Sequence, residues 1–145
     1  MGNNTSLSGI RVALIDDSNT IRRSGELFLT QAGFQVVLAV DGFDGLSKVV
    51  EQHPDVILLD VMMPRLDGYQ TCALIKNHPE FCSIPVIMLT SKDSLFDRAR
   101  GKLVGADQYL VKPFNKRSLV DAISKHIPGN TEGSDREHEK SVDGR

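Results

Sequence analysis

One stretch near the middle of the chain, residues 55–68, constrains the fold more than any other. After Asp55 it contains the apolar run Val56–Leu59, and a single carboxylate, Asp60, follows that run. An unbroken apolar run is typical of a strand buried on both faces, as in parallel sheets covered by helices. Pro64 follows and lacks the N–H that a continuing strand needs. We therefore expect Asp60 at the carboxyl end of a central strand, where ligands bind in open α/β sheets.

Composition excludes several classes of protein. A chain of 145 residues with 40% hydrophobic content suits one globular domain with a proper core. Its net charge of −2 gives no basic field for nucleic acid, and no apolar run approaches the roughly 20 residues of a membrane span. Cys72 and Cys82 lack metal-ligand spacing, so we expect two reduced thiols in a cytoplasmic protein.

Short apolar strands alternate with helical segments along the chain. The expected strands cover residues 11–15, 35–40, 56–60, 84–90 and 107–111. A segment with apolar residues at helical spacing follows each strand. Right-handed crossovers then place the five helices on both faces of a doubly wound parallel sheet, a flavodoxin-like α/β fold.

The domain organisation follows from the same pattern. We expect a flexible N-terminus over residues 1–10, one folded domain over residues 11–127 and a tail over residues 128–145. Val142 is the only large apolar residue of that tail. The tail buries too little surface to offset the entropy of ordering, so we expect it to be disordered.

Chemically active side chains stand at the ends of four strands. The first strand ends in Asp16 and Asp17, the third in Asp60, the fourth in Thr90, and the fifth runs into Lys112. In strand order 2-1-3-4-5 these ends converge at one edge of the sheet. Clustered carboxylates repel one another unless a hard cation such as Mg²⁺ neutralises them.

The same residue types suit the transfer of a phosphoryl group. A carboxylate is a competent nucleophile for an acyl phosphate. Lys112 offers a positive charge for phosphoryl oxygens, and Thr90 offers a hydroxyl donor. Phosphoryl transfer needs little beyond positioning and charge neutralisation, so this set is sufficient.

Residues 11–127 closely resemble the receiver domain of two-component response regulators. The resemblance is carried by an acidic pair, a phosphoacceptor, two short motifs after it, a switch hydroxyl, a switch aromatic and a Lys-Pro pair. The family usually holds the peptide bond of that pair cis, so the resemblance implies a cis bond here. The corresponding residues are Asp16-Asp17, Asp60, Met63-Pro64, Asp67-Gly68, Thr90, Tyr109 and Lys112-Pro113.

The resemblance implies a mechanism. A partner histidine kinase supplies the phosphoryl group, which the Mg²⁺-loaded receiver transfers to Asp60. Asp17, Asp60 and the main-chain carbonyl of Met62 are expected to bind the metal directly, and Asp16 through a water. The chain is then a phosphoacceptor that catalyses its own phosphorylation and dephosphorylation, not an enzyme with a separate substrate.

The resemblance also implies a switch. Thr90 and Lys112 move toward the phosphoryl oxygens, and Tyr109 rotates into the space that Thr90 leaves. The surface of the fourth helix, fifth strand and fifth helix changes, and a downstream protein binds there. Met62 and Lys92 stand where other receivers carry polar residues that orient water, so we expect slow self-dephosphorylation.

The output is expected to be protein–protein contact, since residues 128–145 are too few to fold a further domain. The chain is similar to stand-alone receivers of chemotaxis and of type IV pilus twitching motility, the latter on the opening 16–23. A phosphate sink or phosphorelay shuttle is the alternative within signalling.

Two other classes share parts of the pattern. A haloacid-dehalogenase-type phosphatase also uses a strand-end aspartate and Mg²⁺, but it has a second acid where this chain has Met62. A flavodoxin-like electron carrier needs a hydroxyl- and glycine-rich loop after its first strand. Here Asp16 and Asp17 stand in that position and repel phosphate.

Overall fold

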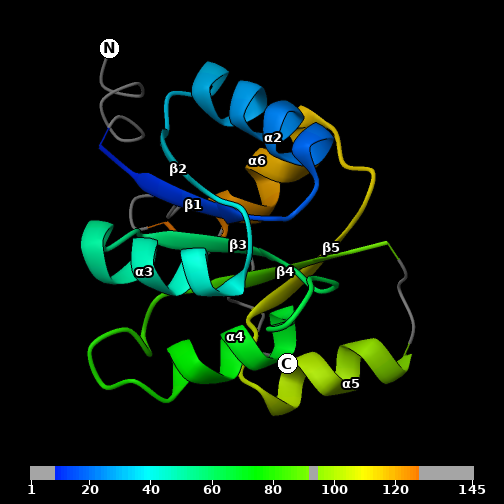
Figure 1. Cartoon of the computed structure of the whole chain (residues 1–145). Helices are drawn as coiled ribbons and strands as arrows, with labels where there is room; N and C mark the ends of the chain where they lie inside the picture. The colour runs from blue at the N-terminus through cyan, green and yellow to red at the C-terminus, as the bar shows by residue number, and fades with distance from the viewer. Residues whose placement is uncertain (1–8, 92–94, 128–145) are drawn as a thin grey trace, which may run out of the picture.

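The computed structural model describes residues 9–91 and 95–127 (Figure 1). Five strands and five helices alternate in this part of the chain. They are β1 (Arg11–Ile15), α2 (Asn19–Gln31), β2 (Gln35–Ala39), α3 (Gly42–Gln52), β3 (Val56–Asp60), α4 (Gly68–Lys76), β4 (Val86–Thr90), α5 (Leu95–Leu103), β5 (Gln108–Val111) and α6 (Lys116–Ser124). The expected tail, 128–145, and residues 1–8 of the expected flexible N-terminus lie outside the described residues.

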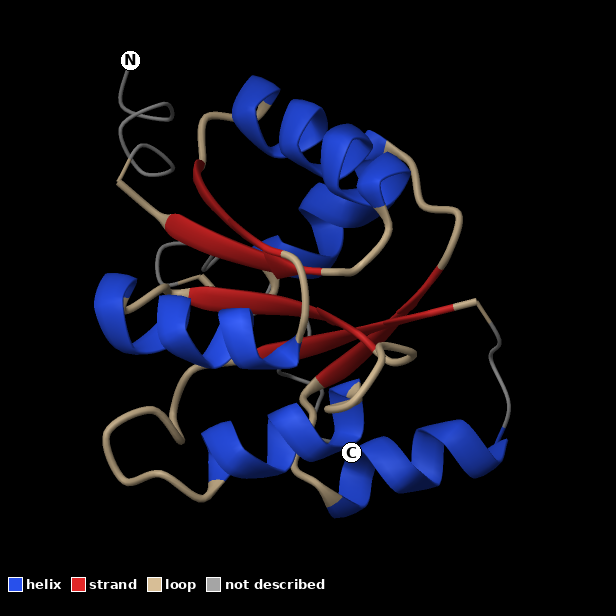
Figure 2. Cartoon of the chain, in the orientation of Figure 1, coloured by secondary structure: helices blue, strands red, loops and turns tan. Residues whose placement is uncertain are grey.

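The strands form one parallel sheet in the order β2-β1-β3-β4-β5, which confirms the predicted topology. Helices α2 and α6 cover one face, and α3, α4 and α5 cover the other (Figure 2). Every residue of β3 and of β4 is buried, as expected for central strands with helices on both sides. The domain therefore has two hydrophobic cores, one on each face of the sheet.

Local sequence signals explain where the helices begin and end. The side chain of Ser18 accepts a hydrogen bond from the N–H of Ile21 at 3.3 Å and caps α2. Gly33, with a φ of +99°, follows the end of that helix. The last helix ends at Ser124, earlier than its apolar pattern suggests. Ile127 lies beyond it in a turn and is still buried against the core.

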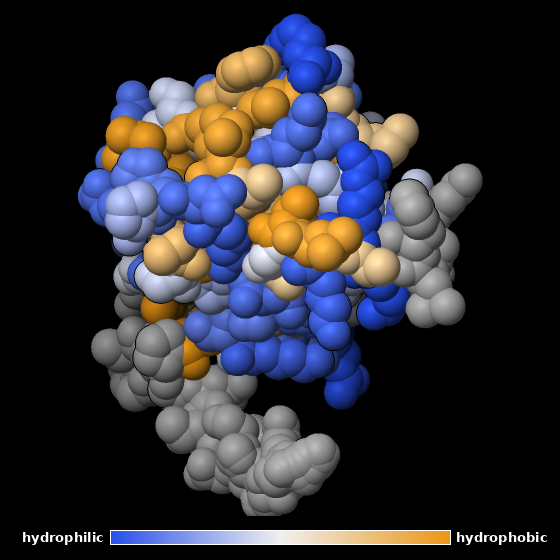
Figure 3. Space-filling model, turned by 90° about the horizontal axis from the view of Figure 1, so that it is seen from below, coloured by the Kyte–Doolittle hydropathy of each residue, from blue (hydrophilic) through white to orange (hydrophobic). Residues whose placement is uncertain are grey.

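The outer surface on the side of α3, α4 and α5 is mainly hydrophilic, with separate hydrophobic patches (Figure 3). Single exposed apolar side chains are normal on soluble domains. Among the side chains of these helices that the structure describes, the large exposed apolar ones are Phe43, Val50, Leu74 and Leu103. Within the described ranges, no helix has the length and apolar character to cross a membrane.

Candidate functional site

The register of the sheet brings the predicted strand ends together. Ile15 pairs with Leu59, so Asp16 emerges beside Asp60. Thr90 pairs with Val111, so Lys112 emerges beside the end of β4. The N–H of Lys112 donates to the Thr90 carbonyl at 2.7 Å, which fixes these two ends to each other.

Three carboxylates meet at this edge. One oxygen from each of Asp16, Asp17 and Asp60 lies within 4.8 Å of the others. Asp16 and Asp60 are buried, whereas Asp17 is exposed. The N–H of Ser18 donates to Asp16 at 2.8 Å and orients that carboxylate. Hard oxygen donors at this spacing suit a divalent cation that prefers oxygen ligands.

Lys112 places a positive charge against the buried carboxylates. Its Nζ lies 3.0 Å from an oxygen of Asp60 and 3.4 Å from an oxygen of Asp16. The Lys112–Pro113 peptide bond is cis, as the resemblance implies. One ammonium cannot neutralise three carboxylates, so the cluster retains negative charge and can attract a further cation.

Burial and charge shift the pKa values of this pair. The pKa of Asp60 is raised from 3.8 to about 6. Burial is the main cause, the charge of Asp16 adds to it, and the hydrogen bond with Lys112 opposes both. Burial alone lowers the pKa of Lys112, but its bond with Asp60 and the charges of Asp16 and Asp60 outweigh burial and raise it. Asp60 is thus largely a carboxylate at neutral pH, at a cost in folding free energy.

Gly68 explains why the loop after β3 can turn back over Asp60. The N–H of Gly68 donates to the Val61 carbonyl at 2.9 Å. A Cβ at position 68 would lie 2.2 Å from the Asp60 carbonyl oxygen and 2.8 Å from the Val61 Cα. Because neither main-chain atom can move freely, only glycine lets α4 start this close to Asp60.

Sequence reasoning gave no role to two arginines that hold the loops of the site. Arg22 donates to the Asp16 carbonyl at 2.6 Å and to the Asn19 side chain at 3.2 Å, which anchors the turn bearing the acids. Arg65, with a φ of +67°, lies 2.6 Å from Asp41 at the start of α3. The sequence offers no signal that distinguishes them from solvated arginines.

The remaining predicted residues lie around the cluster. Thr90 is buried at the end of β4, and Tyr109 is partly buried on β5 with its ring beside Gly101 of α5. The Met62 side chain is 75% exposed and leaves the edge open to water. Lys92 lies outside the described residues.

Comparisons with known proteins agree with this geometry. The family model for the response regulator receiver domain matches residues 12–124. The chain is 58% identical to the protein PilG of Pseudomonas aeruginosa over 123 residues, which cover 85% of this chain and 91% of PilG.

Solved structures are similar in fold and sequence. The chemotaxis protein CheY4 of Vibrio cholerae has a TM-score of 0.79 and 34% identity, over 81% of this chain and 98% of that chain. The receiver domain of a sensor histidine kinase from Pseudomonas aeruginosa has a TM-score of 0.76 and 29% identity, over 81% of this chain and 97% of that domain. That structure has a magnesium ion coordinated in its active-site cleft.

Proposed function

The chain belongs to the family of response regulator receiver domains, and we propose that Asp60 accepts a phosphoryl group from a histidine kinase in a Mg²⁺-dependent reaction. The observation that carries the proposal is the placement of Asp60, buried at the end of β3, 3.0 Å from Lys112 and clustered with Asp16 and Asp17. Family membership disfavours the phosphatase and electron-carrier alternatives.

The carboxylate cluster fits a magnesium ion. Asp17, Asp60 and the Met62 carbonyl would hold it directly, and the buried Asp16 through a water. The donor set is composed of hard oxygens, and its negative charge exceeds what Lys112 neutralises. When bound, the ion supplies positive charge that offsets the repulsion between the carboxylates and the incoming phosphoryl oxygens.

The chain's own residues account for the transfer. An oxygen of the Asp60 carboxylate attacks phosphorus, and a P–O bond forms as the P–N bond to the kinase histidine breaks. The bonding electron pair stays on the imidazole nitrogen. The Lys112 ammonium and the Thr90 hydroxyl then donate hydrogen bonds to oxygens of the new acyl phosphate.

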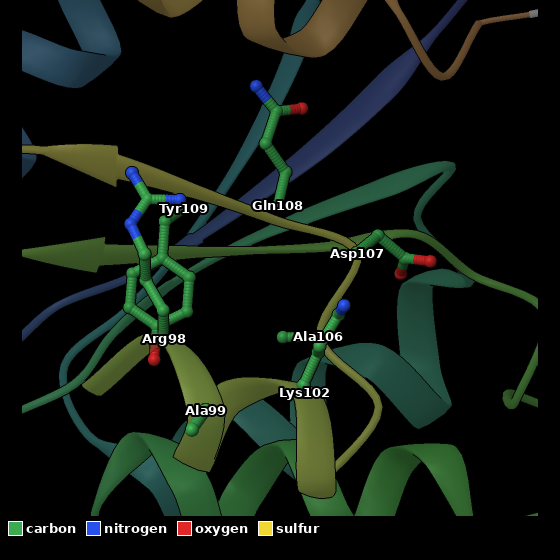
Figure 4. Close-up of a pocket in the computed structure, with 7 residues that line it drawn as sticks. All are labelled: Arg98, Ala99, Lys102, Ala106, Asp107, Gln108 and Tyr109. Carbon is green, nitrogen blue, oxygen red and sulfur yellow. The ribbon is translucent and has the colours of Figure 1, made fainter. Parts of the chain in front are cut away.

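We further propose that the signal leaves through the surface of α5, β5 and α6. Tyr109 is the switch aromatic on this surface. Beside it lies a hollow of about 380 Å³ (Figure 4). Its lining includes Arg98, Ala99 and Lys102 of α5 and Gln108 and Tyr109 of β5. Asp107 also lines it, so the hollow offers two cationic side chains and one carboxylate to a docking protein segment when the switch changes its shape.

The pathway proposal rests on the relatives. Similarity to PilG and to a chemotaxis protein over nearly their whole lengths favours motility control of the chemotaxis or type IV pilus kind. A phosphate sink or a phosphorelay shuttle is the second candidate. The free thiols of Cys72 and Cys82 are in keeping with action in the cytoplasm.

A titration tests the proposed site. We expect Mg²⁺ and then beryllofluoride, a phosphoryl mimic, to shift the NMR signals of Asp17, Thr90, Tyr109 and Lys112 in wild type. The Asp60→Asn protein should show no saturable response to beryllofluoride. If wild type also fails to respond, the phosphoacceptor function is wrong, and the domain acts as a constitutive binding module.

The exposed side chain at position 62 sets the lifetime of the phosphoryl group. We expect Met62→Asn to shorten this lifetime several-fold, because an amide at the open edge can orient an attacking water that a thioether cannot. The measurement is the decay of phosphorylated protein after removal of the donor. Met62→Leu, which adds no polar group, serves as the control and should match wild type. Equal lifetimes for Met62→Asn and Met62→Leu would contradict the role of this position.

A further inference from the structure

The chain contains two tyrosines and no tryptophan, and the two tyrosines touch. Tyr69 comes from the first turn of α4 and is buried at 4% exposure. Tyr109 comes from the edge strand β5. Their hydroxyl oxygens lie 3.1 Å apart, at hydrogen-bond distance. The switch aromatic thus has a specific polar partner on a helix that starts beside Asp60.

A third group closes this contact. The Tyr109 hydroxyl donates to the main-chain carbonyl of Asp97 in α5, which leaves its oxygen free to accept the single proton of the Tyr69 hydroxyl. The Tyr69 hydroxyl also lies 3.3 Å from the same Asp97 carbonyl. Burial raises the pKa of Tyr69, and the neighbouring Tyr109 hydroxyl raises it further. The Tyr69 hydroxyl therefore remains a protonated donor at neutral pH. The hydrogen bonds among Tyr69, Tyr109 and the Asp97 carbonyl thus connect α4, β5 and α5.

Neighbouring residues shape the space for both rings. A Cβ at Gly101 would lie 2.4 Å from Cε1 of Tyr109, so the Tyr109 ring fills the space that any larger residue would occupy. The guanidinium of Arg100 lies 4.3 Å from the centre of the Tyr69 ring and 3.8 Å from Asp67. Arg100 thus links the Tyr69 ring to Asp67, the residue that caps α4. The Tyr109 ring fits against α5 because Gly101 has no side chain.

We propose that Tyr69 is a positioning residue that holds Tyr109 through the hydroxyl pair, in a space provided by Gly101. The inference rests on the proposed function, and it extends the switch from Thr90 and Tyr109 to α4. Repositioning of Tyr109 on phosphorylation must then break its bond with Tyr69. The movement of Tyr109 then affects α4 as well as the surface of α5, β5 and α6.

Tyrosine labelled with ¹³C at Cζ gives two signals in this chain, so the pair can be observed directly. We expect Tyr69→Phe, without any ligand, to move and broaden the Tyr109 signal. Releasing Tyr109 should also tighten beryllofluoride binding in the presence of Mg²⁺, by about two- to tenfold, the factor that corresponds to one ordinary hydrogen bond. Phenylalanine keeps the ring and its packing, and a thermal melt checks that the fold is intact.

A double-substitution cycle separates the hydroxyl contact from general loosening of the core. In a Tyr109→Phe background, Tyr69→Phe should leave beryllofluoride affinity unchanged, because the shared bond is already absent. Gly101→Ala would place a Cβ 2.4 Å from Cε1 and 2.5 Å from the hydroxyl oxygen of Tyr109, so it is expected to displace the Tyr109 signal while the Tyr69 hydroxyl is kept. Glu26→Gln, an exposed substitution on α2 at the other face of the sheet (Figure 2), should leave the Tyr109 signal unchanged.

The results distinguish failure of this inference from failure of the proposed function. An unchanged Tyr109 signal and unchanged beryllofluoride affinity in Tyr69→Phe would overturn the positioning role while wild type still binds the mimic. Equal effects of Tyr69→Phe in both backgrounds would also overturn it. If wild type binds no beryllofluoride, the phosphoacceptor function fails, and the unliganded Tyr109 signal still decides the role of Tyr69.

Discussion

We expect the Asp60→Asn protein to accept no phosphoryl group, from a histidine kinase or from acetyl phosphate. The effect is a complete loss, because the neutral amide cannot form the acyl phosphate and also removes one charge from the metal site. Asn keeps the size of the side chain and can still accept from Lys112, which lies 3.0 Å from Asp60 in wild type. Phosphate-affinity electrophoresis measures the result as a missing mobility shift.

Two further variants make this experiment specific. Asp121→Asn changes an exposed carboxylate on α6 in the same way and should be phosphorylated like wild type. Asp17→Asn should retain a slow reaction, because it weakens metal binding and leaves the nucleophile in place. A mobility shift that persists in Asp60→Asn would assign the phosphoacceptor to another residue.

The fold could be predicted because local and global signals agree. The apolar run Val56–Leu59 allows only a strand buried on both sides, and such strands need covering helices. The strand-end residues favour the order 2-1-3-4-5, which has β2 at the edge and brings Asp16, Asp60 and Lys112 together. The structure confirms that order and that convergence.

Other parts of the site depend on side-chain directions that sequence periodicity does not encode. Arg22 and Arg23 are adjacent, but Arg22 turns back to the Asp16 carbonyl. Tyr69 reads as an ordinary core aromatic on an amphipathic helix, and its hydroxyl partner is 40 residues away. Gly101 lies within a helix, where glycine usually lowers stability. Glycine is needed there because the Tyr109 ring of β5 occupies the space of a side chain. Such contacts emerge only from tertiary packing.

At this site, the charge that function requires lowers the stability of the fold. Asp60 must be charged to act as a nucleophile, yet it is buried beside Asp16, where charge is unfavourable. Lys112 offsets part of this cost. The remainder makes the metal-free domain less stable than its core allows, and a bound cation recovers that stability by mass action.

We accordingly expect Asp60→Asn to stabilise the domain in EDTA at pH 7.5 by roughly 2–3 kcal/mol, because Asn resembles the protonated carboxyl. The pKa of Asp60 is raised from 3.8 to about 6 on folding, so between these values the folded state binds more protons than the unfolded state. Wild-type stability then falls as pH rises from about 4 to 6, and the full cost persists above that range.

Urea unfolding of wild type, Asp60→Asn and Asp121→Asn at several pH values measures this effect. The advantage of Asp60→Asn should shrink to less than about 1 kcal/mol near pH 4, where Asp60 is protonated in the folded state and partly protonated in the unfolded state. Asp121→Asn should stay within about 0.5 kcal/mol of wild type, as exposed substitutions usually do. Saturating Mg²⁺ should reduce the difference in unfolding free energy between the two proteins at pH 7.5, because Asp60→Asn lacks one carboxylate ligand for the ion and gains less from binding it. A variant less stable than wild type in EDTA, or an advantage at pH 4 as large as at pH 7.5, would show that burial of the Asp60 charge does not limit the stability of the metal-free domain.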